Sequence, residues 1–349
     1  FDHTAHNYIH AVCDDLEMRY LGAYSPAMFD LMRKSERNRW LAFMQKFLEG
    51  TARQAPSARV YPPLAFPDFT YTPGPAAAPV DAAGKKILIM KDGRQPAGNA
   101  DALADALAAR FGGAAEVVNL MDIDIKGGCL GCCKCGIDNV CDYQGKDGFI
   151  DFYNEKVKKA EVVVFAGAIH DRYLSSRWKM FFDRSFFNTH TPTLIGKQIA
   201  FLISGPLGQI PNLRQILTAF GEFQESNLAG IVTDESADST AIDALVAELA
   251  DALVRPAVPG YAPPMTFLGV GGRRIFRDEV YGMLRFVFQS DHRYYKEHGL
   301  YDFPQKNYRV RRMNAFMMLL TKIPSVRKKF LKTLTQEMVK PVKTIAETR

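Results

Sequence analysis

Five of the chain's six cysteines fall within thirteen positions. Four of them have the spacing C-x2-C-x2-C-x5-C, namely Cys129, Cys132, Cys135 and Cys141, and Cys133 lies among them. Thiolates at x2 spacing can converge on one cubane, and a more distant fourth thiolate closes it. Zinc sites are typically built from two separated C-x2-C pairs. The spacing therefore favours a [4Fe–4S] cluster over zinc, and redox-active thiols without a metal remain a third alternative.

The composition is that of an ordinary globular protein, with 47% apolar and 23% charged residues in 349 positions. This length suggests about two domains. No run of 18 apolar residues occurs, so we expect no membrane-spanning helix, and no signal peptide is visible. Clustered thiols without dispersed pairing partners indicate metal chemistry in a reducing, cytoplasmic location. Because residue 1 is Phe rather than Met, we expect a processed chain or a fragment.

The net charge of +6 is unevenly distributed. Residues 306–349 carry twelve Lys/Arg and two Glu, a net charge of +10, which leaves −4 on the preceding 305 residues.

Near the end, Val326, Phe330, Leu334 and Met338 fall on one helical face, with basic residues mostly elsewhere. A basic amphipathic helix can bind an anionic membrane surface or an acidic partner. The alternative is that it packs on its own domain or on a second subunit. No nucleic-acid recognition motif accompanies the tail, so we expect no nucleic-acid binding.

The elements around the cysteines follow from composition and periodicity. We expect a helical segment at residues 1–50, which could be the remnant of a preceding domain. Residues 51–84 form a Pro-rich linker whose aromatic residues indicate packing on a surface. Residues 85–254 alternate strands and helices, and residues 255–349 form a C-terminal extension that ends in two basic helices. Predicted strands lie at 86–90, 115–120, 162–166, 198–203 and 228–232. Predicted helices lie at 99–111, 147–158, 175–187, 212–223 and 239–253.

Apolar strands that alternate with helices predict an α/β fold with a parallel sheet covered on both faces. Ligands of such sheets bind beyond the carboxyl ends of the strands. After the first strand, the glycines of residues 93–99, a helix N-terminus and Arg94 favour an anion, although an ordinary polar loop is the alternative. The cysteine loop follows the second strand. Residues 167–176 and 204–207 follow the third and fourth strands.

The order of these motifs resembles a known family. Along residues 85–254, a strand and a Gly/Asn loop are followed by the C-x2-C-x2-C-x5-C loop. A further strand, the motif Ser-Ser-x-x-Lys-x-x-x-Asp-Arg, and a strand that ends in Ser-Gly come after it. This order is similar to that of the flavodoxin-like NADPH-dependent FMN reductases, and within them most similar to that of the iron–sulfur flavoproteins. The resemblance implies a five-stranded parallel sheet in the order 2-1-3-4-5, FMN at the strand ends and a homo-oligomer.

The resemblance also implies site residues. The phosphate-binding residues would be Gly93, Arg94, Gly98 and Asn99. The flavin-ring residues would be Ala168, Ile169, Tyr173, Ser175, Ser176, Ser204, Gly205 and Pro206. The cluster ligands would be Cys129, Cys132, Cys135 and Cys141. The chain departs from the family where Gly93 and Ala100 replace hydroxyl residues of the phosphate loop, and Asp92 would oppose a phosphate dianion.

Three basic side chains are candidates for catalysis, because they could place positive charge near a reduced flavin or select a substrate: His170, Arg172 and Lys179. The alternative for Lys179 and Arg184 is surface ion pairing with Asp183. By helical spacing, we expect Trp178 and Phe181 in the core.

These observations lead to three functional hypotheses. The first is a flavoprotein that passes electrons between FMN and a [4Fe–4S] cluster, with NAD(P)H or ferredoxin as redox partner. The second is an NAD(P)H-dependent reductase of FMN or of a small acceptor such as a quinone, nitro or azo compound, without a cluster. The third is a non-enzymatic protein that binds a membrane surface or a partner through its basic tail.

Overall fold

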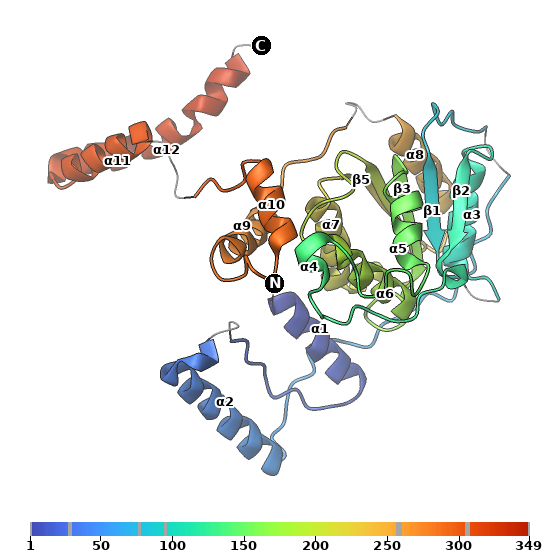
Figure 1. Ribbon diagram of the computed structural model, residues 1–349, viewed down its shortest axis with the longest axis horizontal. Coiled ribbons are helices and arrows are strands. Elements are labelled where there is room, and N and C mark those ends of the chain that lie inside the picture. Colours follow the sequence, from blue (N-terminus) through green and yellow to red (C-terminus); the bar gives the residue numbers. More distant parts are fainter. Residues whose placement is uncertain are drawn as a thin grey trace. The chain divides into compact units, whose positions relative to one another are not determined.

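The computed structural model contains one five-stranded parallel sheet in the order β2-β1-β3-β4-β5 (Figure 1). The strands are β1 (Ile87–Lys91), β2 (Ala115–Asn119), β3 (Val162–Ala168), β4 (Gln198–Ser204) and β5 (Asn227–Thr233). The structure describes residues 2–26, 30–75, 78–93, 96–255, 260–303 and 308–347. The flavodoxin-like strand order expected from the sequence is thereby confirmed.

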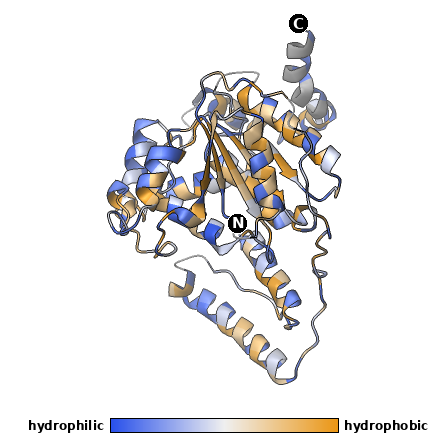
Figure 2. Cartoon of the chain, turned by 90° about the vertical axis from the view of Figure 1, so that its right-hand side faces the viewer, coloured by the Kyte–Doolittle hydropathy of each residue, from blue (hydrophilic) through white to orange (hydrophobic). Residues whose placement is uncertain are grey.

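Helices cover both faces of this sheet, and alternate strand residues point to each face. On one face, α3 (Asn99–Ala109) and α8 (Ser239–Val254) pack on residues such as Ile89 and Val164. On the other, α5 (Phe149–Phe152), α6 (Ser176–Ser185) and α7 (Pro211–Phe223) pack on residues such as Met90 and Phe165. The strands are accordingly apolar along most of their length (Figure 2).

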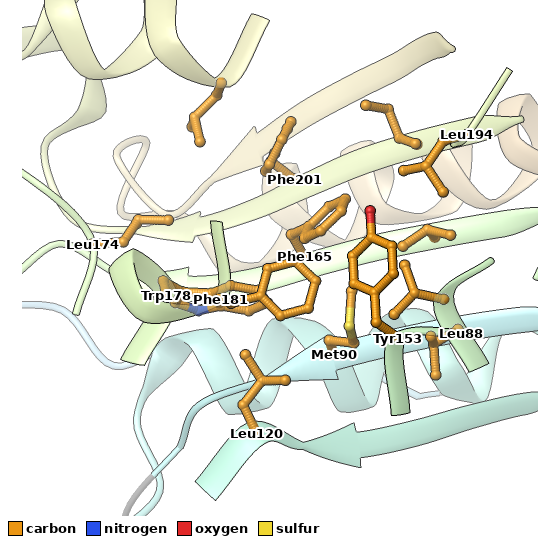
Figure 3. Packing of buried hydrophobic residues seen from close by; sticks show 14 of the residues in the cluster. Leu88, Met90, Leu120, Tyr153, Phe165, Leu174, Trp178, Phe181, Leu194 and Phe201 are labelled. Atoms are coloured by element: carbon orange, nitrogen blue, oxygen red, sulfur yellow. The ribbon is translucent and has the colours of Figure 1, made fainter. Parts of the chain in front are cut away.

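The second face has an aromatic core (Figure 3). Phe165 packs edge-on against Trp178, with ring centroids 5.8 Å apart, and against Phe181 at 6.0 Å. Both α6 side chains are fully buried, as their helical spacing predicted. Because Trp178 and Phe181 fix α6 on the sheet, they also fix the polar residues that α6 presents to the cysteine loop.

Short turns interrupt or extend several of these elements. The helix expected over residues 147–158 is α5 followed by a π-helical turn, η3 (Tyr153–Val157). The cysteine loop contains α4 (Cys135–Asp138) and follows η2 (Leu120–Asp122). The remaining 3-10 turns are η1 (Asp30–Met32), η4 (Phe186–Asn188) and η5 (Leu207–Gln209).

The extensions are helical. The N-terminal part contains α1 (Asp2–Asp15) and α2 (Lys34–Ala52). The C-terminal part contains α9 (Phe267–Tyr281), α10 (Gln289–Glu297), α11 (Tyr308–Leu320) and α12 (Pro324–Glu347). The sequence predicted the last two of these helices but not α9 or α10. The chain divides into two compact units, residues 1–294 and 295–349.

Candidate functional site

The loops after β3 and β4 meet at the carboxyl edge of the sheet. The backbone N–H of Ile169 donates to the carbonyl oxygen of Ser204 at 2.8 Å. Gly205 has a φ of +109°, and a Cβ there would lie 3.1 Å from the Cβ of Ile169 and 3.5 Å from the ring of Phe66. A side chain at position 205 would therefore be strained and crowded. Three residues assigned to a flavin ring by resemblance, Ile169, Ser204 and Gly205, are thus brought together.

A buried carboxylate that follows β5 ties several strand ends to one another. Asp234 is 1% exposed and accepts hydrogen bonds from Ser204 Oγ at 2.7 Å and Gly205 N at 2.8 Å. It also accepts one from Asn99 Nδ2 at 2.8 Å. A buried carboxylate needs such donors, because burial without them is costly. Sequence reasoning did not single out Asp234, and its only signal was an acidic residue directly after an apolar strand.

In the loop expected to bind a phosphate, polar groups such as those of Asn99 and Gly98 already form hydrogen bonds within the protein. Besides its bond to Asp234, Asn99 donates to the carbonyl oxygen of Phe69 at 2.9 Å and accepts from the backbone N–H of Tyr71 at 2.9 Å. The buried Asp101 carboxylate accepts from Gly98 N at 3.2 Å and pairs with Lys91 at 3.2 Å.

The Asp101 carboxylate also fills the hollow beside Gly93, because a Cβ on Gly93 would lie only 1.9 Å from Asp101 Oδ1. Arg94, the cation expected at this loop, lies outside the described residues. The described residues of this loop therefore do not fit a phosphate dianion.

A second acidic residue lies at the end of β1. Asp92 accepts a hydrogen bond from Ser175 Oγ, and the same hydroxyl caps α6 by accepting from Trp178 N at 3.3 Å. Burial raises the pKa of Asp92, while the hydrogen bonds from Ser175 and Trp178 and the nearby His170 oppose that rise. Ser175 is therefore held between β1 and α6.

The Pro-rich linker packs along this edge, as its aromatic residues predicted. We call residues 61–74 the crossing segment. Ala65 and Gln209 exchange two hydrogen bonds of 2.9 Å. Farther along, the hydroxyl of Tyr71 donates to Asp243 at 2.5 Å, and Gly74 N donates to the same carboxylate at 2.9 Å. The crossing segment therefore contacts the loop after β4 at Gln209 and helix α8 at Asp243, and Phe66 lies next to Gly205.

The three candidate catalytic residues have different environments. Arg172 is buried and forms two bonds of 2.7 Å with Asp15 and one of 2.7 Å with the carbonyl oxygen of Pro62. It therefore holds α1 and the crossing segment. Lys179 forms an exposed ion pair with Asp183 on α6. His170 is exposed, and its backbone N–H donates to Tyr173 O at 3.2 Å.

Two arginines of α6 hold the cysteine loop. Arg177 donates to the carbonyl oxygens of Leu120 at 2.9 Å and Ile123 at 2.7 Å. Arg184 donates to the carbonyl oxygen of Gly127 at 3.0 Å. It also forms a bidentate pair with Asp147, with bonds of 2.8 and 3.0 Å, rather than pairing with Asp183.

The pair of Arg184 and Asp147 is fully buried, with side-chain exposures of 1% and 0%. Burial opposes ionisation of Asp147, but hydrogen bonds from Arg184 and from the Lys126 backbone outweigh it, so the pKa of Asp147 is lowered. The Arg184 guanidinium also lies 4.0 Å from the ring centroid of Tyr143. Both ends of the loop are thus fixed to α6, between the cysteines and the core.

One thiol of the cysteine loop, that of Cys135, is buried. Its Sγ lies 3.7 Å from the carbonyl oxygen of Phe186. Burial raises the pKa of Cys135 to about 11, and Cys141, Cys129 and Cys132 act in the same direction. These four are the cysteines of the C-x2-C-x2-C-x5-C pattern. Cys133 instead has a φ of +55° and lies 3.6 Å from Gly131 O. Within the described ranges, no three His, Cys, Asp or Glu side chains are arranged to hold a metal ion.

Comparisons with known proteins find matches among solved structures only. No family model matches the chain, and no curated protein matches it. A Trp repressor binding protein from Bacillus subtilis is 19% identical, with a TM-score of 0.33 over 47% of this chain and 97% of that one. An azoreductase from Bacillus anthracis is 15% identical, with a TM-score of 0.37 over 48% and 96%. A putative quinone reductase from Klebsiella pneumoniae is 16% identical, with a TM-score of 0.39 over 52% and 87%. Such identities and TM-scores carry no functional argument.

Proposed function

We propose that this chain is a flavin-dependent oxidoreductase that takes electrons from NAD(P)H and reduces a small acceptor such as a quinone, nitro or azo compound. The observation that carries the proposal is the junction of the β3 and β4 loops at Ile169, Ser204 and Gly205. This junction lies at the carboxyl edge of a doubly wound sheet, where such folds bind their ligands. A flavin bound there would supply hydride and single-electron chemistry.

The two ends of the proposed flavin site differ in how well they fit. At the ring end, Phe66 is 49% exposed, so this side chain has room to move and admit a flat ring beside Gly205. At the phosphate end, Asp101 fills the hollow and Asp92 adds a second carboxyl group. We therefore infer that the ring loops, rather than the β1 loop, supply most of the affinity for a flavin.

Substitution of Gly205 tests the ring end. We expect Gly205→Ala to weaken flavin binding at least tenfold, because the added Cβ crowds Ile169 and Phe66 where the ring would lie. The matched control is Gly113→Ala. Gly113 also has a positive φ, +90°, but a Cβ there meets nothing within 4 Å. Both variants share the backbone cost, and only the first adds crowding at the site. Flavin fluorescence titration gives the affinities.

Activity separates the proposal from its alternatives. The purified protein, reconstituted with flavin, is expected to oxidise NAD(P)H when a quinone or nitro compound is present. The visible spectrum under anaerobic conditions reports a flavin and a cluster together. A protein that binds no flavin, or that turns over no pyridine nucleotide with any of these acceptors, would contradict the proposal.

A second candidate function is electron transfer through a [4Fe–4S] cluster, with ferredoxin as a redox partner. The spacing of the cysteines favours it, because Cys129, Cys132, Cys135 and Cys141 lie on one short loop at the intervals from which thiolates can converge on a cubane. These four cysteines would hold the cluster, and the loop would have to close around it, since no three ligands are preset among the described residues. When bound, a cluster supplies single-electron steps.

Anaerobic reconstitution with iron and sulfide tests this second function. We expect Cys135→Ser to lose more than half of the iron that the unsubstituted protein retains, because a hydroxyl replaces a cluster thiolate. The control Cys133→Ser is expected to retain its iron. Iron and sulfide assays, and EPR after dithionite reduction, provide the measurements. An unsubstituted protein that holds no iron would exclude the cluster, and equal losses in both variants would refute this ligand set.

A further inference from the structure

We propose that residues 308–333, which comprise α11 and the first part of α12, bind to the surface of an anionic membrane. We call these residues the basic segment. The inference concerns the unit formed by residues 295–349 and is independent of the proposed flavin chemistry. It rests on the exposed side chains of the basic segment and on their charge.

The first observation is a concentration of exposed apolar side chains. Six Met, Phe, Leu and Ile side chains of the basic segment are between 50% and 71% exposed: Met313, Phe316, Met318, Leu319, Ile323 and Leu331. Single exposed apolar residues are common, but a concentration of them marks a surface that binds something apolar. They follow closely along the chain, four of them within α11. Leu334 and Met338, which the sequence placed on the same face as Phe330, lie where only the backbone is described.

The second observation is the charge between these side chains. The basic segment contains eight Lys or Arg residues and no Asp or Glu, and all eight are exposed: Arg309, Arg311, Arg312, Lys322, Arg327, Lys328, Lys329 and Lys332. Three of them occupy the first turns of α11, before its apolar second half. A helix that combines exposed apolar residues with many basic ones is typical of peptides that lie in the interface of an anionic bilayer.

Other occupants fit these observations less well. A second copy of the chain would bring eight more positive charges against the same surface, and like charges oppose such an interface. A purely anionic partner would neutralise the charge but leave the six apolar side chains without a partner. An anionic bilayer satisfies both, because its headgroups meet the Lys and Arg residues and its acyl boundary accepts the apolar side chains.

The geometry favours a surface location. α11 has 13 residues, a length of about 20 Å, which is shorter than the roughly 30 Å hydrocarbon core of a bilayer. Within the part of the chain that the structure describes, no helix combines the length and the apolar character needed to cross a membrane. The basic segment would therefore lie along the surface.

Vesicle co-sedimentation of the full chain tests this inference. The vesicles are pure phosphatidylcholine or phosphatidylcholine with about 30% phosphatidylglycerol. We expect at least tenfold stronger binding to the anionic vesicles. The double variants Met318→Gln/Leu319→Gln and Lys328→Glu/Lys329→Glu are each expected to lose at least tenfold in binding. The matched control is Leu41→Gln/Leu48→Gln in α2, which changes two leucines that are 55% and 60% exposed and is expected to bind as the unsubstituted chain does.

Four outcomes would overturn the inference. Equal binding to both kinds of vesicle would show that the charge of the bilayer plays no part in binding. Retained binding by Met318→Gln/Leu319→Gln would show that charge alone binds the vesicles and that the apolar side chains do not enter the bilayer. Equal losses in the α2 control would show a non-specific effect. If sedimentation velocity shows that Met318→Gln/Leu319→Gln converts a dimer into a monomer and no vesicle binding occurs, the apolar side chains meet a second copy instead.

Discussion

Arg184→Met is expected to lower the free energy of unfolding by about 3–5 kcal/mol, because it leaves the Asp147 carboxylate buried without its cation. Both side chains are almost completely buried, and each terminal nitrogen of the Arg184 guanidinium donates to a different carboxylate oxygen of Asp147. The substitution also removes the donor to Gly127 O, which anchors the start of the cysteine loop. Urea denaturation at pH 7, followed by circular dichroism, measures the difference.

The matched control for Arg184→Met is Lys179→Met, on the same helix. Lys179 and Asp183 form an exposed i,i+4 pair, and such pairs contribute at most about 1 kcal/mol. A loss of less than about 1 kcal/mol in Arg184→Met as well would show that the buried pair does not stabilise the loop.

The pH dependence of the free energy of unfolding is a second test of the stabilisation by the Arg184–Asp147 pair. The folded-state pKa of Asp147 is lowered from 3.8, so its contribution to stability is present above that value and is lost as the pH falls through the folded-state pKa. The intact protein is therefore expected to lose stability in this acidic range. In Arg184→Met the contribution should vanish or reverse, because protonation of an unpaired buried carboxylate favours folding. Unfolding midpoints between pH 3 and pH 7 compare the two proteins.

Asp101→Asn is expected to strengthen FMN binding at least tenfold. The Asp101 carboxylate occupies the space beside Gly93, and the flavin site that we propose would place the phosphate of FMN there. Two unit charges about 4 Å apart repel by about 4 kcal/mol at the effective dielectric of a protein surface, so removal of one charge has a large effect. The amide keeps the size of the side chain and can still accept the hydrogen bond from Gly98 N. Fluorescence titration with FMN measures the change.

Riboflavin and a neighbouring carboxylate provide the controls for Asp101→Asn. Riboflavin lacks the phosphate, so its affinity is expected to stay within about twofold if the effect is electrostatic. Asp105→Asn removes the other partner of Lys91, which lies 3.1 Å away, but Asp105 is largely exposed and should change FMN affinity little. If riboflavin binding rises as much as FMN binding, the carboxylate does not act on the phosphate.

The sheet could be predicted from the sequence because its signals are local and agree with one another. Continuous apolar runs such as residues 162–166 are short and rich in valine, which favours strands buried on both faces, and helical segments separate them at regular intervals. The helix α9 was missed because Gly269, Gly271 and Gly272 lower helix propensity. Tertiary packing stabilises it instead, since Arg277 and Val280 on α9 are buried.

The site was harder to predict because a side chain that can donate a hydrogen bond to a ligand can equally donate it to an acceptor within the protein. Asn99 and Ser204 were assigned to a cofactor by resemblance, and in the structure both donate to Asp234. Arg184 was considered as a partner of adjacent Asp183, but its partner Asp147 lies 37 residues away. Sequence spacing reveals neighbours along a helix, whereas these pairings depend on how distant loops come together.

The crossing segment has a consequence for the order in which the molecule assembles. Its residues precede the sheet in the chain, but its partners come much later, since Tyr71 bonds a residue 172 positions away and Ala65 one 144 positions away. During synthesis the N-terminal residues emerge first, and domains fold as their residues become available. The segment can therefore take its place only after α8 has been made.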